Sequence, residues 1–222
     1  MEELLTQVQQ TFKNNLIKNR KIAALQQKIA EGAATYIDSE QYAYEVGKAL
    51  ADAYGKHFKD MLVDGKIPED IARQILPPTL RSDYDYVTSA TEQIQNNLNK
   101  KAGISLNAIV PGYDLDRQEG LIKYLIENGY ITIEKSFLDS ITEFSQHISD
   151  QSVKDNADFH SKVGFQPVIV RKLVGGACEF CKKRAGTWNY AELTDNEVFR
   201  RHANCRCTVE YIPSKGNKKR VW

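Results

Sequence analysis

Four cysteines and one histidine near the C-terminus have the spacing of a metal site. They form the pattern C-x2-C-x20-H-x2-C-x-C, made by Cys178, Cys181, His202, Cys205 and Cys207. Two close pairs separated by about 12–20 residues are typical of tetrahedral zinc sites, because each pair occupies one turn and the intervening loop lets the turns face each other. A site with four protein ligands leaves no position for water, so we expect a structural zinc ion, not a catalytic one.

The pattern offers five candidate ligands for four positions. Cys178 and Cys181 form the first pair. For the second pair we favour His202 and Cys205, because the thiols of a C-x-C pair that begins a strand lie too far apart to share a turn. Cys207 is the alternative ligand. A redox-active C-x2-C pair and free cysteines without a metal are the other two interpretations.

The 222-residue chain divides into two parts of opposite charge, although its total of 30 basic and 29 acidic residues is balanced. Residues 1–170 hold 18 basic and 24 acidic residues, a net of −6, whereas residues 171–222 hold 12 and 5, a net of +7. The composition, 41% hydrophobic and 27% charged, is that of a globular protein and excludes a fibrous or wholly disordered chain. All four cysteines belong to the basic part.

No apolar run approaches the ~18–20 residues that a bilayer-spanning helix needs. The chain also begins with Met1-Glu2-Glu3, which is acidic where a secretory leader would be basic. We therefore expect a soluble protein made in the cytosol, where disulfides are rare and clustered cysteines indicate a metal.

Apolar periodicity predicts that the segment before the cysteines is mainly helical. Pro77-Pro78 is expected to end one helix, and Ser82 to cap the next. This segment holds no catalytic constellation. The helices are expected at residues 3–30, 42–62, 68–75, 82–101, 120–128 and 136–162, with short strands at 104–110 and 130–133.

Runs rich in β-branched residues predict strands around the cysteines, at 167–170, 187–190 and 208–212. The predicted fold class is α+β: a helical assembly scaffold at 1–165, a zinc-binding unit at 166–213 and a basic tail at 214–222. A unit this small has too little core to be stable alone, which gives zinc a structural role. Removing zinc should loosen this unit and leave the helical part folded.

The basic tail is the candidate nucleic-acid contact. A solvated tail is the alternative. Basic residues near the cysteines could extend the tail into a footprint for phosphates. The tail residues are Lys215, Lys218, Lys219 and Arg220, and the others are Lys182, Lys183, Arg184, Arg200 and Arg201.

Residues 176–181 (GACEFC), 185–187 (AGT) and 200–211 (RRHANCRCTVEY), with Tyr190, resemble the C-terminal signature of MuF-type minor head proteins of tailed bacteriophages. The usual signature is C-x2-C, a small residue with glycine, an aromatic residue, then H-P-x-C-R-C-T. Ala203 stands where proline is common, which changes the turn but no ligand. The match covers about residues 150–212.

The resemblance implies a virion protein, synthesised in the host cytoplasm, that acts near the portal in head assembly and in DNA packaging or ejection. Its expected partners are portal and major capsid proteins, with DNA contact through the tail, and it needs neither a membrane nor a small-molecule substrate. Little sequence follows Pro213, so we expect no enzymatic domain. The alternatives are a zinc- or His-dependent DNA nuclease, with His202 as base beside Arg200 or Arg201, and a zinc-containing DNA-binding regulator.

Overall fold

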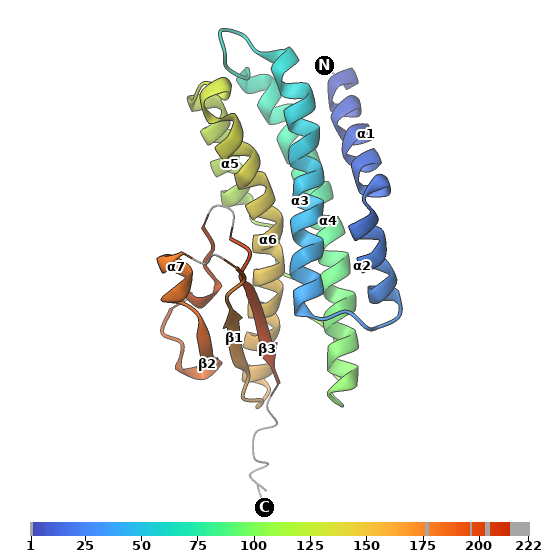
Figure 1. Cartoon of the computed structure of the whole chain (residues 1–222), viewed down its shortest axis with the longest axis vertical. Coiled ribbons are helices and arrows are strands. Elements are labelled where there is room, and N and C mark those ends of the chain that lie inside the picture. The colour runs from blue at the N-terminus through green and yellow to red at the C-terminus, as the bar shows by residue number, and fades with distance from the viewer. Residues whose placement is uncertain (1, 176–177, 196, 203–204, 214–222) are drawn as a thin grey trace, which may run out of the picture.

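A bundle of long helices makes up most of the molecule, and a small sheet packs on one side of it (Figure 1). The structure is a computed structural model that describes residues 2–175, 178–195, 197–202 and 205–213. The α+β fold class is confirmed. The long helices are α1 (Glu2–Lys18), α2 (Arg20–Ala30), α3 (Tyr36–His57), α4 (Glu69–Lys101), α5 (Leu115–Glu127) and α6 (Tyr130–Lys162).

Helices α3 and α6 have the most extensive contact in the described part of the bundle. The predicted stripe along α3 is buried, because Tyr42, Val46, Leu50 and Tyr54 recur every four residues on one face. Figure 1 shows α1 and α2 on one side of α3, and α6 with α5 on the other. The centre of the core therefore lies between α3, α4 and α6.

The prediction of a single helix over residues 3–30 is wrong, because the helix is interrupted at Asn19. The Asn19 side chain caps α2 by accepting hydrogen bonds from the backbone N–H groups of Lys21 and Ile22. Its amide also donates to Glu45 of α3 at 3.0 Å. This cap starts a new helix, and the apolar periodicity continues across the break and conceals it.

The helix end predicted at Pro77-Pro78 is also wrong, because α4 continues through both prolines. Two prolines remove two backbone donors, which weakens an isolated helix. Burial compensates for this loss, since Ile75, Leu76 and Leu80 on either side of the prolines are fully buried in the core. Tertiary packing thus holds a helix that local rules would end.

Neither of the short strands predicted before α6 exists in the described chain. Residues 104–110 have no regular secondary structure, and Asn156 of α6 bonds both the N–H and the C=O of Ile109 at 2.8 Å. Residues 130–133 form the first turn of α6. Tyr130, Ile133 and Phe137 fall on one buried helical face, so the 3.6-residue period prevails over local β-propensity.

The three strands predicted around the cysteines are confirmed and form an antiparallel sheet in the order β2-β1-β3. Ile169, Val209 and Tyr211 of the sheet share one buried cluster with Val153 and Ala157 of α6. The sheet thus packs directly on the helical bundle. The strands are β1 (Val168–Lys172), β2 (Gly186–Asn189) and β3 (Thr208–Ile212), and the short helix α7 (Glu179–Lys182) lies between β1 and β2 in sequence. The 3-10 turns in the described part of the chain are η1 (Phe58–Met61), η2 (Tyr190–Glu192) and η3 (Glu197–Phe199).

Among the described residues, no helix combines the length and the apolar character that crossing a membrane requires.

Asp83 of α4 gives the core a predictable pH dependence. It is fully buried, and the Ser145 hydroxyl donates to its two carboxylate oxygens at 2.8 and 2.9 Å. Burial raises the pKa of Asp83 to about 8. The unfolded value is about 3.9, so the native state retains a proton that the unfolded chain releases. The contribution of Asp83 to the free energy of unfolding is therefore fully present below about pH 4 and is lost progressively as the pH rises to about 8.

Replacing Asp83 with asparagine removes this titration and keeps the side chain's shape. We expect the stability of Asp83→Asn relative to the parent chain to increase from about pH 5 to about pH 8. Urea denaturation of both proteins across this range measures the difference, and groups that titrate in both cancel. A difference that stays constant with pH would show that ionisation of Asp83 carries no penalty.

Candidate metal centre

The first cysteine pair lies at the start of the short helix α7. Cys178 occupies the extended N-cap position, and Cys181 is one turn later, with the N–H of Lys182 bonded to the Cys178 carbonyl at 3.0 Å. Cys178 is exposed and Cys181 is buried. The pair is therefore held on one helical turn, as its C-x2-C spacing predicts.

The second group of ligands lies on the segment before β3. The N–H of Cys205 bonds the His202 carbonyl at 3.0 Å. Cys205 and Cys207 are both buried, each with 2% of its surface exposed. β1 and β2 flank α7 in sequence and β3 follows Cys207, so pairing within the sheet brings the two ligand segments together.

Neighbouring ligand atoms lie close to the separations found around a bound metal ion. The Nε2 atom of His202 is 3.2 Å from the Cys178 sulfur and 3.0 Å from the Cys181 sulfur, and the sulfurs of Cys181 and Cys205 are 3.5 Å apart. Tetrahedral zinc, with bonds of about 2.3 Å to sulfur and about 2.0–2.1 Å to nitrogen, separates its ligands by about 3.5–3.8 Å. The residues present therefore fit a metal ion.

Two groups can hold a metal ion, and Cys181 belongs to both. One is Cys178, Cys181 and His202, and the other is Cys181, Cys205 and Cys207, each with its ligand atoms within 4.8 Å of one another. The premise that the thiols of Cys205 and Cys207 lie too far apart is wrong. β3 begins only at Thr208, so the C-x-C segment precedes the strand and is not pleated. Which four of the five residues bind stays a prediction.

The two thiols of the first pair differ in acidity. Burial raises the pKa of Cys181 to about 12, and the neighbouring thiols of Cys207 and Cys205 add to this effect. The backbone N–H groups of Cys181 and Phe180 hold the pKa of Cys178 below its usual value. Since thiolates are the metal-binding form, the metal must displace the Cys181 proton, and binding weakens as the pH falls.

Two arginines with buried side chains contact the cysteine segment, and the sequence predicted neither contact. Nη2 of Arg171 lies 3.6 Å from the Cys205 sulfur, and its Nη1 donates to the Val198 carbonyl at 2.5 Å. Arg201 contacts the carbonyls of Cys205 and Cys207. One signal was available, because Arg171 is two residues after buried Ile169 and so shares its inward face of β1.

The basic residues near the cysteines are mostly engaged with carboxylates. Arg184 and Arg200 both pair with Glu197. Lys182 pairs with Glu179 at 2.7 Å. The expectation that Arg201 contacts phosphates is wrong, because its side chain is 6% exposed and pairs with Glu40 and Asp150. The tail candidates Lys215, Lys218, Lys219 and Arg220 lie outside the described residues.

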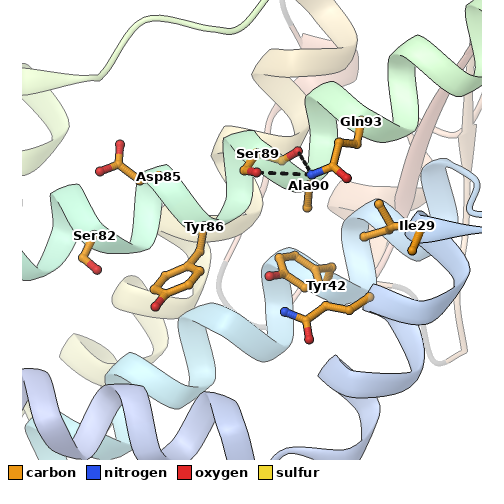
Figure 2. A pocket seen from close by; sticks show the side chains of 10 residues that line it. Ile29, Tyr42, Ser82, Asp85, Tyr86, Ser89, Ala90 and Gln93 are labelled. Carbon is orange, nitrogen blue, oxygen red and sulfur yellow. Dashed lines mark hydrogen bonds between the residues drawn. The ribbon is translucent and has the colours of Figure 1, made fainter.

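A separate groove of about 560 Å³ lies between α2, α3 and α4 (Figure 2). Tyr42 and Tyr86 point into it, and the Gln93 amide donates to the carbonyl and hydroxyl of Ser89 at 3.0 and 3.3 Å. Figure 1 places α2 and α7 on opposite sides of the bundle. The groove lining contains no cysteine or histidine, so the groove adds nothing to the metal centre.

Isolated polar residues of the helical part have structural roles. Asp114 caps α5 by accepting from the Arg117 N–H at 2.8 Å. His57 bonds the Thr11 hydroxyl, and Nδ1 of buried His160 faces the Tyr211 hydroxyl. These contacts stabilise the start of α5, the packing of α1 on α3 and the packing of β3 on α6.

No family model, curated protein or solved structure matches this chain.

Proposed function

We propose that this chain is a non-enzymatic minor capsid protein of a tailed bacteriophage, a head morphogenesis protein that acts at or near the portal. The observation that carries the proposal is the cluster around Cys181. The signature-like residues come from two segments that lie 20 residues apart, and their ligand atoms meet at 3.0–3.5 Å. The motif is thus a spatial site as well as a sequence pattern.

The metal in this proposal is a structural zinc ion. Thiolates and an imidazole together suit zinc, whereas Mg²⁺ and Ca²⁺ prefer oxygen ligands. The ion would be held by Cys178, Cys181, His202 and Cys205, with Cys207 as the alternative ligand. Burial of three of the four cysteines supports a closed, structural site.

The nuclease alternative has less support from the geometry. It requires an open metal position or His202 acting as a base. Nε2 of His202 faces the thiols of Cys178 and Cys181, which is the orientation of a ligand. Arg201, the neighbour that would contact a phosphate, is buried against Glu40 and Asp150.

The proposed mechanism is binding. The helical bundle presents its surface to portal and major capsid proteins in the virion, while the zinc-stapled unit remains fixed to α3 and α6. DNA contact through the basic tail belongs to the same proposal.

Virion composition and portal binding test this function. We expect the chain to be present in few copies in particles purified from the phage whose genome encodes it, as counted by quantitative mass spectrometry. It should also co-purify with the portal protein of that genome when the two are co-expressed. Absence from both particles and portal complexes would contradict the proposal. So would cutting of plasmid DNA with Mg²⁺ or Zn²⁺ that His202→Ala abolishes.

A further inference from the structure

Arg201 is the point at which the metal-binding segment meets the helical bundle. It precedes the candidate ligand His202, and its side chain is 6% exposed. Its Nη1 lies 3.2 Å from the Cys207 carbonyl and 3.4 Å from the Cys205 carbonyl. The same guanidinium group therefore contacts the backbone of two further candidate ligands.

The other side of this guanidinium faces two helices. Its Nη2 donates to Glu40 of α3 at 2.5 Å and to Asp150 of α6 at 2.7 Å, and its Nε also faces Asp150. Both carboxylates are buried, with side chains 7% and 3% exposed. These residues lie 161 and 51 positions from Arg201 in sequence.

Gln146 of α6 closes the network. Its amide donates to the Cys205 carbonyl at 3.0 Å and to Glu40 at 2.5 Å. The Cys205 carbonyl thus faces one donor from the bundle and one from Arg201. Residues that orient ligands in this way commonly change metal affinity 10–100-fold when they are replaced.

We propose that Arg201 is a positioning residue that couples metal binding to the docking of the cysteine segment on α3 and α6. This inference rests on the proposed zinc site and goes beyond it. The coupling is reciprocal: a docked segment presents its ligands in a fixed arrangement, and a bound ion holds the segment on the helices. Chelation therefore loosens α3 and α6 near this contact, and its effect extends beyond the sheet.

Arginine is needed here because of its shape. A planar guanidinium has five donors in a fork and reaches acceptors on opposite sides, whereas a lysine ammonium is a point charge with three donors. Arg201→Lys keeps the positive charge between Glu40 and Asp150 and loses the fork. The substitution therefore separates positioning of the ligand segment from charge compensation.

The first test compares the zinc affinity of the full chain with that of two matched variants. We expect Arg201→Lys to weaken zinc binding about 10–100-fold in competition with a chromophoric chelator and to alter the Co²⁺ absorption spectrum. Arg200→Lys is the control, because Arg200 is adjacent in sequence but its side chain is 63% exposed and pairs with Glu197. The control should bind as tightly as the parent.

The outcomes separate the two proposals. A parent chain that binds no zinc overturns the zinc site, and the coupling with it. A parent that binds zinc, with a folded Arg201→Lys variant of equal affinity, overturns the coupling and leaves the zinc site intact.

The second test needs no variant and covers the case in which Arg201→Lys fails to fold. Hydrogen exchange of the parent chain is followed before and after chelation of the zinc. We expect faster exchange around Glu40 in α3 and around Gln146 and Asp150 in α6, with α1 and α5 unchanged. Faster exchange confined to residues 168–212 would overturn the coupling.

Discussion

Replacing Cys181 with serine is expected to reduce the zinc content of the purified chain from about one ion to nearly none. Cys181 belongs to both groups that can hold a metal ion, whereas each other candidate belongs to one. Its side chain is also buried, whereas that of Cys178 is exposed. The loss should loosen the sheet, because binding of a structural zinc contributes directly to folding free energy. Metal analysis and far-ultraviolet circular dichroism measure the two effects.

Cys178→Ser is the matched control for this prediction. Cys178 is exposed and belongs to one group only, so the group of Cys181, Cys205 and Cys207 stays intact without it. We expect this variant to keep zinc at reduced affinity. If Cys181→Ser retained as much zinc as Cys178→Ser, Cys181 would not be the shared ligand.

Gly47→Ala is expected to lower the free energy of unfolding by about 1–3 kcal/mol, because it overpacks a close contact between α3 and α6. A Cβ atom at Gly47 would lie 2.3 Å from the Ser145 hydroxyl oxygen and 2.9 Å from the Thr142 Cα atom. The second atom belongs to the backbone, so rotating a side chain cannot relieve the clash. The helices would have to separate, and Ser145 would move away from Asp83.

Gly120→Ala provides the control for this substitution. Gly120 is exposed in the middle of α5, and a Cβ there would meet nothing within 4 Å. Alanine is the better helix former by about 0.8–1.0 kcal/mol, so Gly120→Ala should be neutral or stabilising. Urea denaturation measures both variants. Equal stability of Gly47→Ala and the parent would contradict the close packing of α3 on α6.

Periodic and spaced features of this fold could be predicted from the sequence. The four-residue repeat from Tyr42 to Tyr54 predicts α3 and its buried face. β-Branched runs predict β1 and β3, and the C-x2-C spacing predicts that Cys178 and Cys181 share a turn. In each case neighbours in sequence determine the structure.

Features that depend on distant residues could not be predicted. Helix α4 continues through Pro77-Pro78 because the surrounding core buries it. The ion pairs of Arg201 join residues far apart in sequence, so no local pattern identifies them. The close approach of Cys207 to Cys181 depends on where β3 begins, and strand boundaries are poorly determined by propensity.

The sequence predicts that removing zinc loosens the C-terminal unit and leaves the helical part folded. The expected boundary near residue 165 falls between the end of α6 and the start of β1. Ile169 and Tyr211 nevertheless pack in one cluster with Val153 and Ala157 of α6. Because the unit and the bundle share buried apolar surface, zinc removal should affect both.

The most direct test of the metal centre is the mass of the natively purified full chain, measured by native mass spectrometry before and after treatment with a strong chelator. The proposed zinc site predicts one zinc ion per chain, lost on chelation together with the protection of Cys181, Cys205 and Cys207 from thiol alkylation. A chain of unchanged mass, whose three buried cysteines react equally with and without chelator, would contradict the zinc-stapled site.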